Sequence, residues 1–228
     1  MFVDIIIGNP AEILPKKLLD ELELLVPDNT NSVASIIAQI KAIHDNETRI
    51  FALLFIDSLE IEVDYKRQIF SEFLFDSSSD IQYHMVLFVG KYTLSESISA
   101  LQTIKNTSDG LNQCTAIWSL AKLDYHDGLT NQIIEIFPKV KNERALALLA
   151  VALYLINNNA NSQEMLFLKD YFLANCYDEE KQHFFPTILQ TSTFSPELIA
   201  HLLWQVGYKF VEFHSWNSLD IDWLINDV

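Results

Sequence analysis

Hydrophobic positions along the chain recur with the three-to-four-residue spacing of amphipathic helices almost everywhere. The clearest case is the run from Ala145 to Ile156, which follows Asn142 and is so apolar that it predicts a helix buried on most sides. Asp80 is a good N-cap for another helix, which Gly90 is expected to end. Short polar breaks separate these helices, and no linker or shift in composition divides the chain. We therefore predict a single all-α domain over residues 1–228.

The predicted helices return at a nearly constant spacing. First helices of pairs are expected to begin near Glu47, Asp80, Leu111 and Asn142, which are 33, 31 and 31 residues apart. A second helix follows each of them, over residues 64–74, 95–104, 130–137 and 162–173.

Aligning the chain by these steps produces columns of similar residues. One column is polar and holds Arg49, Gln82, Gln113 and Arg144. Two columns are apolar and hold Ala52, Met85, Ala116 and Ala147, and Ile56, Val89, Leu120 and Val151. Helix pairs that stack face to face require columns that keep their apolar character from copy to copy. A large residue at Ala116 or Ala147 is expected to overpack the core.

The segment from Leu111 to Ile156 resembles HEAT repeats. Residues Cys114 to Leu123 resemble the first helix of a unit, Asp124 to Asp127 the turn, and Leu129 to Phe137 the second helix. Arg144 stands where the start of the next unit favours an arginine. The resemblance implies an all-α fold, a HEAT-like α-solenoid of about six helix pairs.

The resemblance is strongest in the middle of the chain. The best repeats span residues 47–174, and we predict atypical capping regions over residues 1–46 and 175–228. A short strand over Phe2–Ile7 is compatible with the first of these regions. Tetratricopeptide repeats fit less well, because Trp118 lacks the Leu-Gly and Tyr that follow the tryptophan of that motif.

The charge balance narrows the choice of partner. The chain has 31 acidic and 15 basic residues among 228, for a net charge of −16. Such a field repels nucleic acid backbones and anionic membranes and attracts basic partners. A second interpretation stays open, in which the surplus only keeps a chain with 50% hydrophobic residues soluble. The first eight residues carry no Lys or Arg, so they resemble neither a signal peptide nor a spanning helix, and we expect a cytoplasmic address.

Motifs that carry chemistry are weak in this sequence. Ser119 and Lys122 match the SxxK motif, but no SDN or KTG partner follows them. Cys114 and Cys176 form no CxxC pair. The histidines show no metal-binding spacing; they are His44, His84, His126, His183, His201 and His214. We therefore expect no catalytic residue, no metal and no cofactor.

Acidic side chains recur on the second helices, which line the concave side of HEAT-like stacks as the resemblance implies. They are Glu72, Asp76, Glu96, Glu135, Glu164 and Asp170. Near the C-terminus aromatic residues alternate with acids, and Trp216, Asp220, Asp222 and Trp223 are the candidates there. These ten residues are the predicted partner-binding residues. The alternatives are that the acids form an ordinary solvated face and that the tryptophans only cap the last helix pair.

An acidic, HEAT-like chain without a catalytic motif resembles, by type, the immunity proteins of bacterial toxin–immunity systems. That resemblance implies a non-catalytic, monomeric protein that sequesters or neutralises a basic protein, such as a toxin. A housekeeping adaptor is the alternative that the sequence cannot separate from this one. A HEAT-like enzyme such as a DNA repair glycosylase is disfavoured, because those enzymes present basic concave surfaces.

Overall fold

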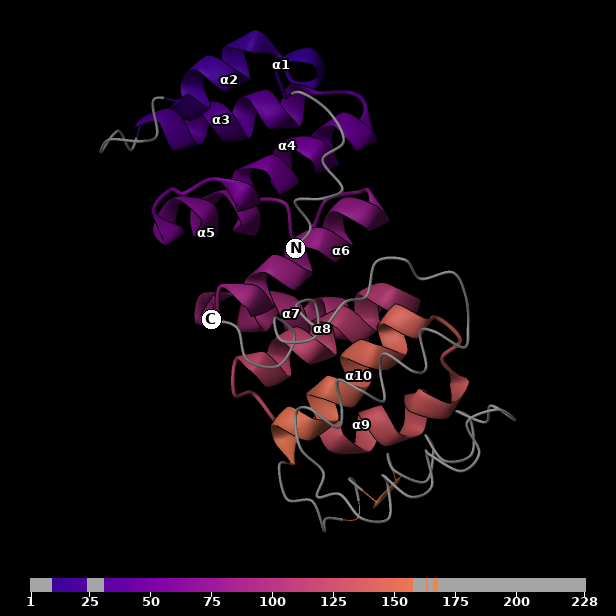
Figure 1. Cartoon of the computed structure of the whole chain (residues 1–228). Coiled ribbons are helices and arrows are strands. Elements are labelled where there is room, and N and C mark those ends of the chain that lie inside the picture. The colour runs from indigo at the N-terminus through magenta and orange to yellow at the C-terminus, as the bar shows by residue number, and fades with distance from the viewer. Residues whose placement is uncertain (1–9, 24–30, 158–162, 164–165, 168–228) are drawn as a thin grey trace, which may run out of the picture. The chain divides into compact units, whose positions relative to one another are not determined.

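The computed structural model describes residues 10–23, 31–157, 163 and 166–167 (Figure 1). Helices account for 78% of the residues that can be interpreted, and none of those residues lies in a strand. This content is far above the roughly one third that is usual for globular proteins, so the predicted all-α class is confirmed. The strand considered for Phe2–Ile7 lies outside the described residues.

The chain separates into two compact units, Met1–Ala100 and Leu101–Val228. The first contains α1 (Pro10–Ile13), α2 (Lys16–Glu23), α3 (Asn31–Ala42), α4 (Asn46–Ser58), α5 (Val63–Ser71), α6 (Ser79–Lys91) and the 3-10 helix η2 (Ser95–Ser97). Helix α7 (Ile98–Thr107) spans the boundary. The second contains α8 (Gly110–Lys122), α9 (Leu129–Ile136), the 3-10 helix η3 (Phe137–Lys139) and α10 (Glu143–Ile156).

Side-chain caps explain where three of the long helices begin. Asp45 accepts a hydrogen bond from the backbone N–H of Thr48 at 2.7 Å and caps α4. Ser78 caps α6 and Asn142 caps α10 through the same type of contact, three residues into the helix. The predicted N-cap Asp80 is wrong by two positions, because the Ser78 hydroxyl supplies the cap.

The predicted end of α6 at Gly90 is also wrong. The helix continues through Gly90 to Lys91, and Gly90 itself is buried. A glycine weakens a helix interior by only about 1 kcal/mol, which tertiary packing can offset. The chain leaves the helix at Thr93, whose φ of 50° is left-handed.

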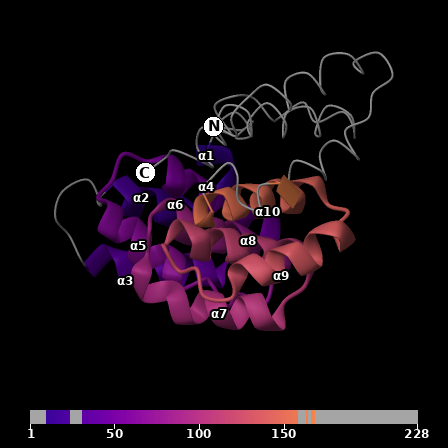
Figure 2. The same ribbon diagram turned by 90° about the horizontal axis from the view of Figure 1, so that it is seen from below.

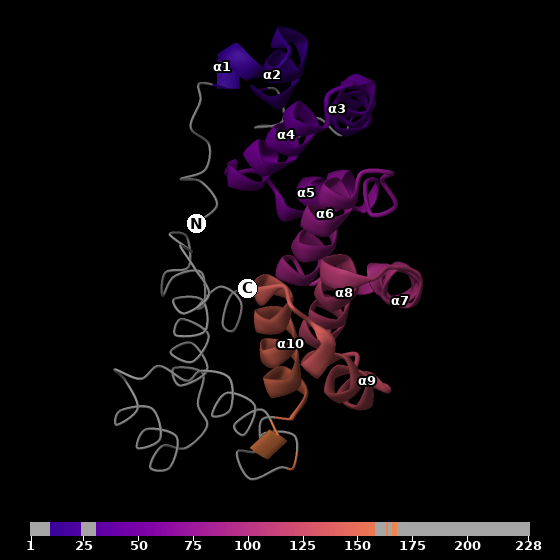
Figure 3. The same ribbon diagram turned by 90° about the vertical axis from the view of Figure 1, so that its right-hand side faces the viewer.

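In the first unit each helix packs on its neighbour in the chain, and α3 and α4 also pack on the helix after that. Helix α3 contacts α5, and α4 contacts α6 (Figure 3). Both helices carry fully buried side chains, with Ile36 and Ile40 on α3 and Ile69 and Phe70 on α5. The core of this unit is therefore continuous from one helix pair to the next.

In the second unit α8 and α10 lie side by side, and α9 contacts both of them (Figures 2 and 3). Trp118 is the largest of the fully buried side chains and Cys114 is buried with it. On α10 six consecutive residues, Leu148 to Leu153, are buried, as predicted for a helix covered on most sides.

The apolar columns fall in these cores. Ala52, Met85 and Ala116 are fully buried, and so are Ile56, Val89, Leu120 and Val151. The side chains of Ala147 and Arg144 lie outside the described ones. Helix α10 begins 33 residues after α8, at Glu143, against a predicted step of 31. Leu149 and Leu153 of α10 are also fully buried.

Helices α6 and α8 share one local design. Gln82 Nε2 donates to the carbonyl oxygen of Leu74 at 3.2 Å. Gln113, the equivalent residue of α8, donates through its Nε2 to the carbonyl oxygen of Lys105 at 3.1 Å. Each glutamine thus binds its helix to the chain segment that precedes it.

The same two helices end alike. Thr93 and Asp124 both have a left-handed backbone, with φ of 50° and 60°. The following N–H groups, of Leu94 and Tyr125, reach back five residues to Val89 and Leu120 at 3.1 and 3.0 Å. This is the Schellman arrangement, which satisfies carbonyls that a helix end leaves unpaired.

Candidate protein-binding surface

The predicted acidic residues on the second helices divide into exposed and paired ones. Glu72 is the C-cap of α5 and is exposed; its carboxylate pairs with Lys41 of α3 at 2.8 Å. Both partners are about half exposed, so water and a competing cation can reach them. Exposed pairs of this kind contribute about 0–1 kcal/mol and are readily exchanged.

Asp76 has a more internal position than the sequence suggests. It lies in the loop between α5 and α6 and forms an ion pair with Arg49 of α4, in which the side chains are 9% and 12% exposed. Its other carboxylate oxygen accepts a hydrogen bond from the backbone N–H of Ser78 at 2.9 Å. Asp76 therefore fixes the loop, and its carboxylate is largely covered.

Glu96 and Glu135 are exposed, each in its own unit. Glu96 lies in η2, directly before α7. Glu135 is on α9 and pairs with Lys139 at 3.2 Å, in an exposed i, i+4 contact. The other six candidates, Glu164, Asp170, Trp216, Asp220, Asp222 and Trp223, lie outside the described residues.

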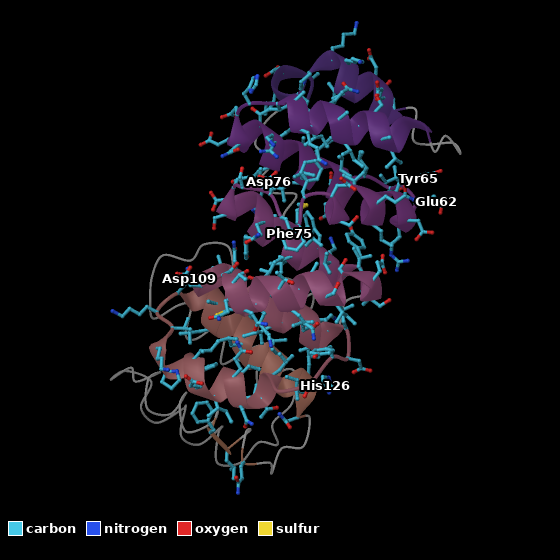
Figure 4. The ribbon with its side chains drawn as sticks, turned by 180° about the vertical axis from the view of Figure 1, so that it is seen from behind. Glu62, Tyr65, Phe75, Asp76, Asp109 and His126 are labelled. Atoms are coloured by element: carbon cyan, nitrogen blue, oxygen red, sulfur yellow. The ribbon has the colours of Figure 1, made fainter. Side chains whose placement is uncertain are left out.

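Sequence reasoning missed Phe75, which is next to Asp76 (Figure 4). Its side chain is 63% exposed, more than any other large apolar residue in the described part of the chain. Phe73 and Leu74 beside it are buried. No signal in the sequence indicates that Phe75 is exposed, because a comparable apolar run on α10 is buried throughout.

Hydrogen bonds hold Phe75 in a fixed turn. The backbone N–H groups of Phe73, Leu74 and Asp76 each donate to the carbonyl three residues earlier, at 3.1 to 3.4 Å. Gln82 holds the Leu74 carbonyl from the side of α6. Figure 4 shows Phe75 and Asp76 on the side of the unit opposite Glu62 and Tyr65, at the start of α5. The turn therefore presents an aromatic ring to solvent on rigid backbone.

The most connected charged cluster in the described residues lies at the C-terminal ends of α4 and α6. Lys66 Nζ donates to the carbonyl oxygen of Asp57 at 2.6 Å, and Lys91 Nζ lies 3.0 Å from Asp57 Oδ2. The Tyr92 hydroxyl donates to Asp57 Oδ1 at 2.5 Å. Arg67 donates to the carbonyl oxygen of Tyr92 at 3.2 Å. The cluster therefore joins α4, α5 and α6. Its cations are also favourably placed, because positive charge near a helix C-terminal end is stabilising.

Burial governs proton binding in this cluster. Lys66 is 7% exposed, and burial lowers the pKa of its ammonium, opposed by the charge of Asp57. Burial, the Asp57 charge and the hydrogen bond to Asp57 raise the pKa of the Tyr92 hydroxyl. The Lys66 ammonium donates to the Asp57 carbonyl oxygen and to the Tyr92 hydroxyl. Because it holds two helices together in this way, we interpret Lys66 as a structural residue.

The motifs that the sequence offered for chemistry are mostly covered. Ser119 of the SxxK match is fully buried. Cys114 is fully buried, and this burial raises the pKa of its thiol to about 12, which keeps it protonated and unreactive. His126 Nε2 lies 3.5 Å from Asp124 Oδ1 in the exposed turn after α8.

Within the described ranges, no group of three or more histidine, cysteine, aspartate and glutamate side chains is arranged to hold a metal ion. Among the helices that the structure describes, none is both long and apolar enough to cross a membrane. Comparison of the chain with protein-family models, with curated proteins and with solved structures finds no match.

Proposed function

We propose that this chain is a non-catalytic binding protein that sequesters a basic protein partner, and that it acts as an immunity protein blocking a toxin. The observation that carries the proposal is the surplus of 31 acidic over 15 basic residues. A field of this sign accelerates encounter with a basic protein and slows encounter with nucleic acid. We expect a monomer that acts in the cytoplasm and needs no cofactor.

A HEAT-like solenoid of about six helix pairs is the scaffold in this proposal. Its support is the nearly constant spacing of the helix starts at Asn46, Ser79, Gly110 and Glu143. The shared local design of α6 and α8 supports it further. Stacked helix pairs offer extended surfaces that partner proteins bind.

Among the predicted acids that the structure describes, Glu72, Glu96 and Glu135 are the ones suited to meet such a partner, because they are exposed. Asp76 has a supporting role, since its carboxylate already holds Arg49. Trp216, Trp223 and the acids near them stay part of the proposal as aromatic anchors with an acidic rim.

Co-purification from the native host at low ionic strength, followed by identification of the bound protein, tests the proposal. We expect a basic partner whose association rate with the purified chain falls as salt increases. If the partner is a toxin, its activity should fall as the chain is added, up to one equivalent.

A second test uses a variant that exchanges Glu72, Glu96 and Glu135 for glutamine. It should associate more slowly while its helix content stays that of the parent chain. An acidic partner, or association that is indifferent to salt, would contradict the proposal. A basic partner with no toxic activity would favour the housekeeping adaptor.

A further inference from the structure

The turn after α5 already binds two cationic side chains of the protein itself, and it binds both in the same way. Lys41 Nζ lies 5.6 Å from the centre of the Phe73 ring and pairs with the Glu72 carboxylate. The Arg49 guanidinium lies 5.9 Å from the same ring and pairs with Asp76. Each cation therefore meets an aromatic ring and a carboxylate together. These two contacts attract a cation by the ring quadrupole and by direct charge.

Phe75 presents the same combination on the outside of the turn. Its ring is 63% exposed, and Glu72 precedes it by three residues in a turn of i to i+3 hydrogen bonds. Asp80, also exposed, follows in the first turn of α6. Along the sequence the outer ring therefore lies between two exposed acids, Glu72 and Asp80, as the inner ring lies between Glu72 and Asp76.

We propose that Phe75, with Glu72 and Asp80, is the docking point for an arginine side chain in a basic segment of the partner protein. This inference rests on the proposed function and names its aromatic anchor within the described residues. Arginine fits better than lysine, because its planar guanidinium stacks on a ring while it donates to a carboxylate. The hydrogen-bonded turn keeps the ring in place, so docking costs little ordering of the chain.

The test uses the full chain and three fluorescent peptides of equal length, one rich in arginine, one rich in lysine and one uncharged. The wild-type chain should bind the arginine peptide more tightly than the lysine peptide. Loss of the ring in Phe75→Ala should weaken binding of the arginine peptide by about two- to five-fold, the range expected for a cation over an exposed ring. Phe75→Ala should also remove the preference for arginine, and Phe75→Trp should retain or increase it, because indole is the better partner for a cation.

Val63→Ala is the matched control. Val63 is also an exposed apolar residue of the first unit, at 44%, and it lies at the start of α5 next to Glu62. Its loss should leave both affinities unchanged. Because Phe75 is mostly exposed, Phe75→Ala should keep the helix content and melting temperature of the wild type, and a circular dichroism melt on each sample checks this.

The outcomes separate this inference from the function on which it rests. Equal affinity of wild type and Phe75→Ala for the arginine peptide would overturn the docking point. If exchange of Glu96 and Glu135 for glutamine, which leaves Glu72 in place, still weakened binding of both basic peptides, the acidic binding function would stand without the docking point. Failure of both basic peptides to bind more tightly than the uncharged one would also overturn the docking point, whereas the co-purified partner decides the proposed function.

Discussion

Arg49 and Asp76 form an ion pair between α4 and the loop after α5, with side chains only 12% and 9% exposed. The pair fixes the turn that presents Phe75 to solvent, and Asp76 also receives the backbone N–H of Ser78. A residue that sequence charge alone assigned to partner binding thus has a structural task.

Arg49→Met should lower the free energy of unfolding by about 3 kcal/mol, because it leaves the Asp76 carboxylate covered and without its cation. Urea denaturation measures the loss. Lys139→Met is the control, since it removes an exposed pair with Glu135 and should change the free energy by less than about 0.5 kcal/mol. Similar losses for the two variants would show that the Arg49 pair is solvated.

Ala116→Phe should destabilise the chain by about 1–3 kcal/mol or more, because Ala116 is fully buried on α8 and a large ring has no space there. Ala42→Phe, at the exposed end of α3, should cost about 0.5 kcal/mol or less. Melting temperatures by circular dichroism compare the two variants. An unchanged melting temperature for Ala116→Phe would place α8 differently from the structure described above.

Thr93→Gly should raise the free energy of unfolding by about 1 kcal/mol. Thr93 is β-branched and has a φ of 50°, a conformation that glycine adopts without strain. Gly128→Ala is the opposite test. Gly128 has a φ of 68° and open space around its Cα, so the variant should lose about 1 kcal/mol by backbone strain alone. Urea denaturation of both variants should therefore give shifts of opposite sign.

Tyr92 should make unfolding depend on pH in the alkaline range. Its pKa is raised in the folded state, so above pH 10 an unfolded tyrosine loses its proton while folded Tyr92 keeps its own. The folded state then binds more protons, and its stability falls as pH rises. Tyr92→Phe should be less stable than the wild type at pH 7, and this gap should narrow between pH 10 and 11. A gap that stays constant would mean that the hydroxyl titrates normally.

Trp223→Ala remains a test of the C-terminal segment, which lies outside the described residues. If Trp223 is an interface anchor, the variant should lose about 2 kcal/mol or more of affinity for the co-purified partner. Melting temperature and affinity are measured on the same preparation. A lower melting temperature with unchanged affinity would restrict the tryptophan to a capping role.

The starts of the long helices could be read from the sequence to within one residue, although the cap of α6 was assigned to the wrong residue. Asn142 was predicted to open a helix from its own neighbours, and it caps α10. The end of α6 could not be read in this way, because packing carries the helix past Gly90. The 3-10 helix η3 before α10 was not predicted, because so short a turn leaves no distinct pattern in the hydrophobic spacing.

The candidate surface was predicted in part. Exposure of Glu72, Glu96 and Glu135 follows from their charge, which water stabilises. The position of Asp76 depends on Arg49, which lies 27 residues earlier in the chain, and no local pattern shows that contact. Phe75 was missed because an apolar residue in an apolar run is expected in the core.

The hydrogen bonds that begin, register and end α6 all join residues between Leu74 and Leu94, and those that register and end α8 join residues between Lys105 and Tyr125. Each set is complete within its own stretch of chain. Consider a duplication or deletion between equivalent positions of the two stretches. It would add or remove one complete set of these hydrogen bonds and leave the other set intact. After a genetic change of that length, the turn that ends the remaining helix would still be built from residues of its own stretch.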